Sequence, residues 1–446
     1  MVLEDEGLPP EATTSHRGGA LPAAAGRGRH LSRASRRTRL RRSLLVVAMA
    51  VALVVVLLQL TGSSTPARAV KAARGGAVAQ GAQGLSSAQG AHGLPFPSPS
   101  GKGMAPGPNL APGSVPSALA GDVLIADEGN NRLVVVNPAG RIVWQFPQPG
   151  DLAPGQSFLS PDDAFFTSTG HDILATEETY QVVSLISIPQ HRILWRYGTP
   201  GVPGAGPNHL SNPDDAMQLP NGDVLVADIK NCSVLLIAPG AHVPLERFGV
   251  QDTNCYHQPP LRFGSPNGAF PLTNGNYLIT EINGDWVDEM TLSGKILWST
   301  HPPGVTYPSD TNEVSPGRFL TVDYSTPGQI VEFNKTGTLL WRYGPTSGPG
   351  MLTHPSLCEP IPTNGDILCN DDHNDRVIVV NPRTNKIVWQ YGHTGVVGTA
   401  PGYLNGPDGV DMAPPNSMLV RHAPTMGVPS GHCASGLPAG ACTIFP

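Results

Sequence analysis

The sequence has few charged residues and none of the familiar nucleotide-binding or hydrolytic motifs. Only 14% of its 446 residues are charged, whereas Gly (52) and Pro (47) are abundant. This composition argues against a helical or coiled-coil protein and favours many turns. A Gly-rich phosphate loop, a serine-centred elbow and a zinc-binding helix motif are absent from the sequence. None of its six cysteines forms a CxxC pair, which argues against a cysteine-based zinc site.

Positive charge is scarce in the larger, C-terminal part of the chain. Residues 118–446 contain 30 acidic and 15 basic side chains, whereas residues 1–42 contain nine arginines and four acidic residues. Phosphate binders need a positive face, so this acidic part argues against nucleic acid as a partner.

One long apolar run stands near the N-terminus. Residues 43–60 contain no charged side chain, and as a helix they would span about 27 Å, close to the hydrocarbon thickness of a bilayer. Six arginines within residues 33–42 predict that residues 1–42 form a disordered cytoplasmic tail and that the chain beyond residue 60 lies outside the cytoplasm. We therefore expect a single-pass signal anchor in the cell membrane. The alternative is a secreted protein, cleaved near Ala69 after the A-x-A pattern at 67–69.

A biased segment follows the apolar run. Residues 63–117 contain no acidic residue and a single aromatic one, Phe96, and small residues and Pro dominate them. Such a composition cannot bury a core, so residues 61–117 are expected to form a disordered linker. We expect a folded domain over residues 118–422 and a C-terminal tail over 423–446.

A repeated pattern fills the folded domain. A strand-like run of the type DVLVAD ends in an acid, and a second apolar run and a run of the type KIVWQY follow it. The terminal acids recur at intervals of 42 to 53 residues, and they are Asp127, Glu177, Asp228, Glu281, Asp323 and Asp371. Multi-stranded repeats of this length predict an all-β propeller. The terminal acids are expected to accept hydrogen bonds within the turns that follow them, and the Trp residues of the last runs to pack between blades.

A further strand precedes each run, as in SPDDAFF at 160–166 and NPDDAMQ at 212–218. Each unit therefore has four strands. The last copy, GPDGVDM at 406–412, has no unit of its own and can complete the first blade, which closes the ring without a free edge. We predict six blades. The alternative is a seventh, partial blade that begins at residues 417–420.

These motifs resemble known repeats. PDDA at 213–216 with NGDVLVAD at 221–228, and DDHNDRVIVVNP at 371–382, resemble NHL repeats. The endings GRIVWQF at 140–146 and NKIVWQY at 385–391 are similar to PQQ-like propeller repeats and, more weakly, to the repeats of bacterial aryl sulfotransferases. The resemblance implies propeller architecture and does not by itself imply a function.

The residues that follow the repeated Pro are expected to line one mouth of the central channel. We call these six residues the channel ring: Asp162, Asp214, Asn267, Ser309, Ser356 and Asp408. Three acids come next in the sequence, and we call them the inner carboxylates: Asp163, Asp215 and Asp310. Such oxygen ligands can hold Ca²⁺, or a cationic or hydroxylated ligand. Alternatively, each side chain only caps local backbone N–H groups. Because adjacent like charges repel, the Asp-Asp pairs favour a bound cation.

Several histidines lie in loops near the first strands: His209, His257, His301 and His354. The sulfotransferase resemblance implies a nucleophilic His at the start of a first strand and an Arg later in the same blade. His354 with Asn374 and Arg376 fits best, and His209 is a further candidate, but Pro355-Ser356 stands where an Asp or Asn is expected. The quinoprotein dehydrogenases have eight blades and an adjacent-cysteine disulfide, so PQQ is not expected and no cofactor is required.

All six cysteines follow the apolar run, and their spacing suggests three local disulfides, Cys232–Cys255, Cys358–Cys369 and Cys433–Cys442. The Cys358–Cys369 pair also follows from strand register. A turn at 362–365 pairs Ile361 with Asp366, and this register places Cys358 directly opposite Cys369.

We therefore expect a membrane-anchored extracytoplasmic propeller that binds a small molecule, a glycan or a protein at its channel mouth without catalysis. The alternative is an enzyme on the same fold, an aryl sulfotransferase-like transferase or a lyase.

Overall fold

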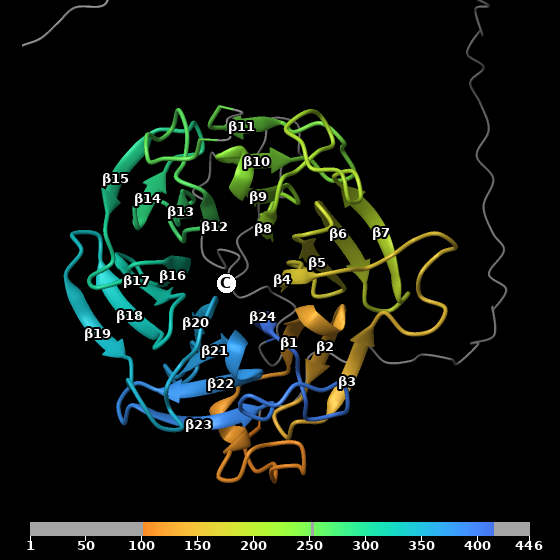
Figure 1. Ribbon diagram of the computed structural model, residues 1–446, viewed down its shortest axis with the longest axis vertical. Coiled ribbons are helices and arrows are strands. Elements are labelled where there is room, and N and C mark those ends of the chain that lie inside the picture. Colours follow the sequence, from red (N-terminus) through yellow and green to blue (C-terminus); the bar gives the residue numbers. More distant parts are fainter. Residues whose placement is uncertain (1–100, 251–253, 414–446) are drawn as a thin grey trace, which may run out of the picture. The chain divides into compact units, whose positions relative to one another are not determined.

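The computed structural model describes residues 101–250 and 254–413. These residues form six four-stranded antiparallel sheets around a central axis (Figure 1). The prediction of an all-β, six-bladed propeller is thus confirmed. The segments 1–42, 43–60, 417–420 and 423–446, for which a tail, a membrane anchor, a further blade and a second tail were predicted, lie outside the described residues. Within the described residues, no helix is long and apolar enough to cross a membrane.

In every blade the innermost strand lines the channel, and the other three follow it outward (Figure 1). Blade 1 contains β24 (Pro407–Met412), β1 (Val123–Asp127), β2 (Arg132–Val136) and β3 (Ile142–Phe146). Blade 2 contains β4 (Pro161–Phe166), β5 (Asp172–Glu177), β6 (Val182–Ser187) and β7 (Arg192–Tyr197). Blade 3 contains β8 (Pro213–Gln218), β9 (Val224–Asp228), β10 (Ser233–Ile237) and β11 (Glu246–Phe248).

The other three blades repeat this order. Blade 4 contains β12 (Pro266–Pro271), β13 (Tyr277–Glu281), β14 (Trp286–Met290) and β15 (Ile296–Thr300). Blade 5 contains β16 (Pro308–Ser315), β17 (Arg318–Asp323), β18 (Gln329–Asn334) and β19 (Leu339–Tyr343). Blade 6 contains β20 (Cys358–Pro360), β21 (Ile367–Asp371), β22 (Arg376–Asn381) and β23 (Lys386–Tyr391). Short 3-10 turns lie at Pro116–Ala118, Glu128–Asn130, Ile229–Asn231 and Asp372–Asn374.

Two distant parts of the chain complete blade 1. β24 pairs antiparallel with β1, and Met412 lies opposite Val123. The predicted use of residues 406–412 as the innermost strand of the first blade is therefore confirmed. The pairing closes the ring without leaving the inner edge of β1 unpaired.

Asn-Gly turns join the two innermost strands of blades 3, 4 and 6. In blade 3, Leu219 N–H donates to the carbonyl of Asp223 (2.7 Å), and Gly222 between them has a φ of 91°. Gly adopts this left-handed region without a Cβ clash, which explains its place in the turn.

The core lies between neighbouring blades. Four buried apolar clusters each join two consecutive blades, and a fifth, larger cluster joins blades 1, 2 and 6 with single side chains of blades 3 and 4. This arrangement explains why many strands are buried along their whole length, as in VLIAD of β1.

Outer-strand tryptophans link the blades, as predicted. The indole N–H of Trp144 in blade 1 donates to the carbonyl of Ile188 in blade 2 (3.2 Å). Trp389 in blade 6 is fully buried and donates to the carbonyl of Pro138 in blade 1 (2.9 Å). Each ring therefore contributes buried area and a satisfied donor at a blade boundary.

The segment just before blade 1 differs from the prediction. Val115 N–H donates to the carbonyl of Val388 (2.8 Å), and Ala111 N–H donates to the carbonyl of Gln390 (3.1 Å). Leu110 bridges to Tyr391 and is buried. The prediction that a disordered linker extends to residue 117 is therefore wrong for residues 101–117. These residues pack along β23 because that outermost strand has free backbone groups at its edge.

Two of the three predicted disulfides are present. Cys358 lies opposite Cys369 in the register of β20 and β21, and the two are bonded. Cys232 is bonded to Cys255. The predicted Cys433–Cys442 pair lies outside the described residues.

Candidate functional site

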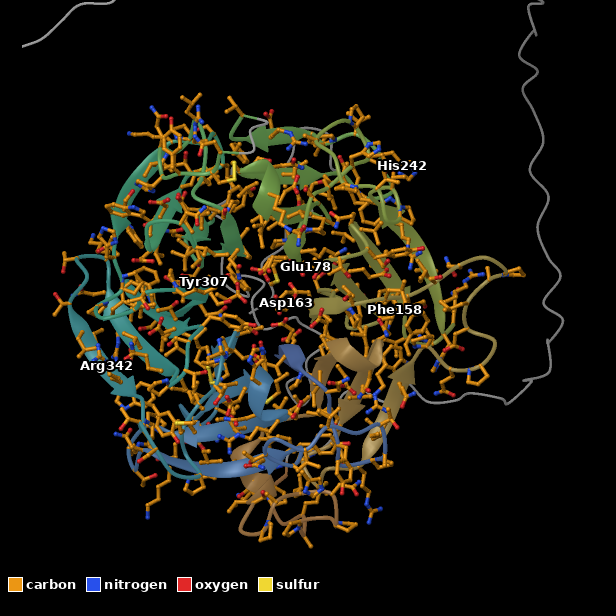
Figure 2. All side chains as sticks on the ribbon, viewed as in Figure 1. Phe158, Asp163, Glu178, His242, Tyr307 and Arg342 are labelled. Atoms are coloured by element: carbon orange, nitrogen blue, oxygen red, sulfur yellow. A yellow bond between two sulfur atoms is a disulfide. The ribbon has the colours of Figure 1, made fainter. Side chains whose placement is uncertain are left out.

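The six residues of the channel ring meet at one end of the channel. They line a single cavity of about 140 Å³, together with Asp163, Glu178, Ile229, Tyr307 and Tyr324. In five blades the innermost strand begins at the repeated Pro, and in blade 6 it begins at Cys358, three residues after Pro355. In every blade the residue that follows the Pro lies at the channel mouth. Figure 2 shows Asp163, Glu178 and Tyr307 at the centre of the propeller and Arg342 at its periphery.

The cavity is acidic and rich in oxygen ligands. Five carboxylates line it: Asp162, Asp163, Glu178, Asp214 and Asp408. No Lys or Arg is among the described residues of its lining. The charge of Lys230 lowers the pKa of Glu178, although burial raises that pKa more. The site therefore suits a cation or a hydroxylated molecule and disfavours an anion.

The acids form two overlapping triads. One oxygen each of Asp162, Asp163 and Asp214 lies within 4.8 Å of the others, and so does one oxygen each of the inner carboxylates Asp163, Asp215 and Asp310. Asp163 belongs to both triads, so five carboxyl groups form one continuous buried cluster.

Only part of this cluster is satisfied by hydrogen-bond donors. Asn267 Nδ2 donates to Asp214 Oδ2 (2.7 Å), and Ala269 N–H donates to Asp215 Oδ2 (3.0 Å). Within the described part of the chain, one oxygen of Asp163 and both of Asp310 have no donor, although the two side chains are only 3% and 1% exposed. Buried carboxylate oxygens without donors are costly, so they need a proton or a cation.

Burial governs the protonation of these groups. It raises the pKa of Asp163 well above the usual range, and the charges of neighbouring acids raise that pKa further. Burial likewise raises the pKa of Asp310, and the charge of the neighbouring Asp215 raises it further. For Asp215 itself, burial raises the pKa to about 7. Without a cation, the cluster therefore retains protons at neutral pH.

Glycines of neighbouring blades leave room for the inner carboxylates. A Cβ on Gly268 would lie 2.9 Å from Asp310 Oδ1, and a Cβ on Gly409 would lie 2.5 Å from Asp163 Oδ1. Further along the channel, Phe165 of β4 and Phe270 of β12 meet edge to face with ring centroids 5.9 Å apart. Apolar side chains therefore fill the channel beyond the acids.

An aromatic rim borders the cavity, and the sequence analysis did not identify it. The rings of Tyr307 and Tyr324 lie 5.3 Å apart, Tyr324 lies 4.8 Å from His354, and His354 lies 4.1 Å from His373. Two cavity residues that were not predicted, Tyr324 and Glu178, share one sequence position: each directly follows the terminal acid of its strand. This position could have identified them. Side chains alternate along a strand, so the residue after a terminal acid points differently from the acid itself and reaches the cavity.

The predicted role of the terminal acids in the following turn is met in blades 1, 3 and 6, where Asn130, Asn231 and Asn374 donate to Asp127, Asp228 and Asp371. All six acids also accept backbone bonds that were not predicted, from the loops before the innermost strands. In blade 2, Glu177 accepts a hydrogen bond from the backbone N–H of Leu159, in the loop that leads to β4 (2.9 Å). The other terminal acids accept equivalent backbone bonds from Asn405, Ser211, Gly264, Thr306 and Thr353. These buried bonds fix the entry into each innermost strand.

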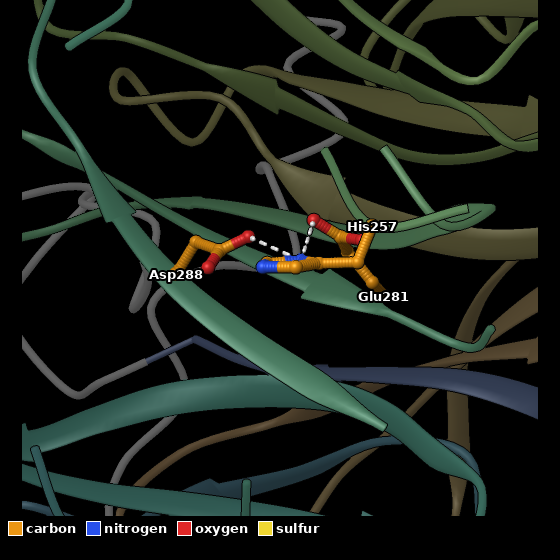
Figure 3. Close-up of side chains that lie close together, drawn as sticks. All are labelled: His257, Glu281 and Asp288. Carbon is orange, nitrogen blue, oxygen red and sulfur yellow. Dashed lines mark hydrogen bonds and ion pairs between the residues drawn. The ribbon is translucent and has the colours of Figure 1, made fainter. Parts of the chain in front are cut away.

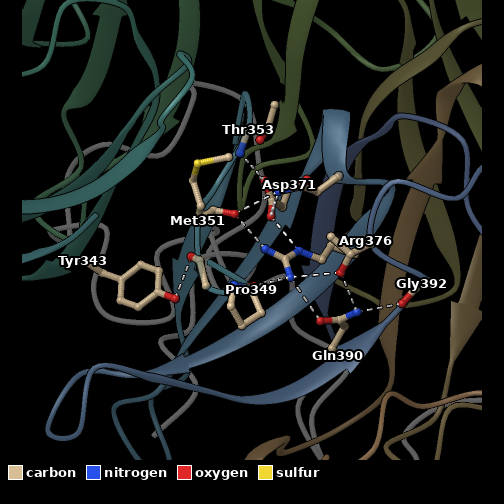
Figure 4. A network of polar contacts seen from close by, with 11 residues as sticks. Tyr343, Pro349, Met351, Thr353, Asp371, Arg376, Gln390 and Gly392 are labelled. Carbon is tan, nitrogen blue, oxygen red and sulfur yellow. Dashed lines mark hydrogen bonds and ion pairs between the residues drawn. The ribbon is translucent and has the colours of Figure 1, made fainter. Parts of the chain in front are cut away.

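The sulfotransferase candidates do not form a catalytic group. Arg376 is 1% exposed, and its Nε donates to Asp371 Oδ2 (2.7 Å) while its other nitrogens donate to the carbonyls of Pro349 and Met351 (Figure 4). Asn374 Nδ2 donates to the same aspartate (2.9 Å). The hypothesis that Arg376 and Asn374 bind a sulfuryl group is therefore not supported, because a buried terminal acid and loop carbonyls occupy their donors.

The two histidine candidates are separate from one another. His209 contacts the carbonyl of Pro207 through Nδ1 (2.9 Å) and does not line the cavity. His354 lies on the aromatic rim, and burial, followed by the charge of His373, lowers its pKa. The described residues place no arginine in contact with His354, so the geometry offers no sulfuryl-binding site beside it.

Comparisons with known proteins found distant structural neighbours and no related sequence. The sequence matches no established protein family and no curated protein. A protein of unknown function from Bacteroides caccae is similar in structure (18% identity, TM-score 0.46, 65% of this chain and 97% of that one). Virginiamycin B lyase from Staphylococcus aureus is also similar in structure (15% identity, TM-score 0.42, 60% of this chain and 80% of that one). So is a chain of a nidogen/laminin complex (12% identity, TM-score 0.46, 66% of this chain and 98% of that one). Such likenesses say nothing of what this chain binds, and the NHL and PQQ-like resemblance stays a prediction.

Proposed function

We propose that this chain is a membrane-anchored extracytoplasmic propeller that binds Ca²⁺ at its channel mouth and uses the occupied site to bind a further ligand, without catalysis. The observation that supports this most directly is the pair of overlapping carboxylate triads, which have unsatisfied oxygens and no cationic side chain in the described cavity lining.

The ligand chemistry favours Ca²⁺ over a transition metal. The cavity offers carboxylate, amide and hydroxyl oxygens, and neither His nor Cys is among its described lining residues. Ca²⁺ takes six to eight oxygen ligands in flexible geometry, whereas transition metals favour nitrogen or sulfur ligands. A cation at the triad of Asp162, Asp163 and Asp214 would face the cavity and retain open coordination positions.

The rim suits a hydroxylated ligand at those open positions. Tyr307 and Tyr324 present two aromatic rings beside the acids. A sugar or polyol can bind Ca²⁺ through its hydroxyl groups and pack its C–H face against an aromatic ring. This combination supports the glycan alternative among the ligands expected from the sequence.

The location outside the cytoplasm rests on sequence features and on two disulfides. The uncharged run 43–60 and the arginines before it predict the anchor. The bonded pairs Cys232–Cys255 and Cys358–Cys369 are typical of an oxidising compartment.

The test is calorimetric titration of the full-length protein, in detergent and after EDTA treatment, with Ca²⁺. We expect saturable binding that D162N and D214N each weaken at least tenfold, since each variant removes one charged ligand. The matched control is E246Q, which removes a charge from the exposed outer strand β11. Absence of binding up to millimolar Ca²⁺, or equal affinity in D162N, D214N and E246Q, would contradict the proposal.

A further inference from the structure

Most blades neutralise their buried terminal acid with an arginine. The pairs, with their closest N–O distances, are Arg132–Asp127 (2.6 Å), Arg196–Glu177 (2.8 Å), Arg247–Asp228 (3.7 Å) and Arg376–Asp371 (2.7 Å). A buried carboxylate needs such a partner because an isolated charge in the interior is strongly unfavourable.

Blade 4 departs from this pattern by adding a second acid. In blade 2, Ser184 lies opposite Arg196 in the strand register. The equivalent positions in blade 4 hold Asp288 and Ser299. Glu281 therefore has a buried carboxylate beside it in place of a serine, and no guanidinium on the neighbouring strand.

Within the described residues, His257 is the only basic side chain that lies within 4.0 Å of these two acids. His257 Nδ1 lies 3.1 Å from Glu281 Oε1 and 3.8 Å from Asp288 Oδ2 (Figure 3). Glu281 Oε2 accepts the N–H of Gly264 (2.5 Å). Asp288 is fully buried, and its carboxyl group lies against that of Glu281, which raises the pKa of Asp288 further after burial itself. Two buried carboxylates and one imidazole thus converge with less positive charge than blades 1, 2, 3 and 6 supply to their terminal acids.

The position of His257 is fixed by contacts outside the cluster. Its ring stacks on Trp286 at a centroid distance of 4.2 Å. The disulfide Cys232–Cys255 ties the loop that bears His257 to the start of β10, and Asn283 Nδ2 donates to the carbonyl of Cys255 (3.1 Å). The His257 side chain is 21% exposed, so solvent reaches one side of the cluster.

We propose that His257, Glu281 and Asp288 bind a divalent transition metal, Zn²⁺ above all, which takes the place that arginine has in blades 1, 2, 3 and 6. The three ligand atoms lie within 4.8 Å of one another. Ligands about 2.1 Å from a tetrahedral Zn²⁺ are about 3.4 Å apart, so the two measured distances bracket the required spacing. A water on the exposed side of His257 completes the coordination.

The chemistry of this cluster differs from that of the channel ring. An imidazole nitrogen with two carboxylates suits Zn²⁺, whereas the all-oxygen ring suits Ca²⁺. Burial lowers the pKa of His257, and burial followed by Glu281 raises the pKa of Asp288 to about 9.

The test titrates EDTA-treated, full-length protein with Zn²⁺ by calorimetry, and measures bound zinc by mass spectrometry after dialysis. We expect H257Q and D288N each to lose one equivalent of zinc, or to bind that equivalent at least 100-fold more weakly than the wild type does. H373Q is the matched control, since it removes a histidine from the His354–His373 pair elsewhere on the surface. D162N tests independence from the channel ring. Both controls should retain the equivalent that H257Q loses.

Two results would overturn the proposal: no zinc bound by the wild type, or an equal zinc content in wild type, H257Q and D288N. D288N is close to isosteric, and circular dichroism shows whether it folds. If D288N fails to fold, Co²⁺ titration of wild type and H257Q decides. The site is supported if Co²⁺ quenches Trp286 fluorescence and produces a d–d absorption band in the wild type, and if the quenching is weaker and the band is missing in H257Q. Identical Co²⁺ spectra in both proteins contradict it.

Discussion

Replacing Asp215 by Asn tests whether the inner carboxylates make the metal-free propeller sensitive to pH. Burial raises the pKa of Asp215 to about 7 from an ordinary 3.8. Each pKa unit corresponds to about 1.4 kcal/mol, so ionising Asp215 in the folded protein costs at most about 4 kcal/mol. Between about pH 4 and pH 7 the folded state holds a proton that the unfolded state has lost. Stability therefore falls as the pH rises through this window, and this contribution levels off above it.

The D215N variant cannot ionise, and its amide oxygen can still accept the N–H of Ala269, which donates to Asp215 in the wild type. We expect metal-free D215N to be about 1–3 kcal/mol more stable than the wild type at pH 8, and no more stable than the wild type at pH 5. Added Ca²⁺ should stabilise the wild type at pH 8 more than it stabilises D215N, because the variant removes one of the five buried carboxylates whose repulsion the cation would relieve.

Urea unfolding of the full-length protein, followed by tryptophan fluorescence with EDTA or Ca²⁺ at both pH values, measures these differences. E246Q should follow the wild type. The reasoning is refuted if D215N and wild type lose the same stability between pH 5 and pH 8, because Asp215 would then not hold its proton in the folded state.

Three further substitutions test the structural contacts. R376A should lower the free energy of unfolding by about 3–5 kcal/mol, because a buried aspartate loses its partner; R318A, at an exposed ion pair, should cost less than about 1 kcal/mol, and equal costs would contradict the structural role of Arg376. W389F should cost about 1–2 kcal/mol in urea unfolding, through the lost donor between blades 6 and 1; an unchanged midpoint would argue against that bond. The double substitution C358S/C369S should cost about 2–3 kcal/mol; alkylation of both cysteines in unreduced protein, seen by mass spectrometry, would show that the pair is not bonded.

Much of the fold follows from local patterns in the sequence. The repeated terminal acids and the Asn-Gly turns predict blades of four strands, because each hairpin depends on residues close together in the chain. The pairing of Cys358 with Cys369 follows from one short turn for the same reason. The start of the ordered region was misplaced, since residues 101–117 lack the periodicity of a strand and are held by the edge of β23.

The candidate site was predicted in part. The channel ring follows from one sequence position repeated in every blade, and the structure brings all six residues to one cavity. The role of Arg376 could not be predicted from its position alone. The sequence places it one turn beyond Asp371, but only the packed loops show that carbonyls of residues 349 and 351 occupy its remaining donors.

The sequence by itself predicted six blades with seven as the alternative, the closure of the ring by residues 406–412 and the six residues of the channel ring. Only the tertiary structure decided which acids meet. Asp163, Asp215 and Asp310 come from three different blades, and Gly268 and Gly409 leave the space that their neighbours' carboxylates fill. His257 likewise meets Asp288 only because a disulfide and a stacked tryptophan hold its loop over β14. The physical reason is that strand alternation fixes the face on which a side chain lies, whereas contacts across a channel depend on how whole sheets pack around it.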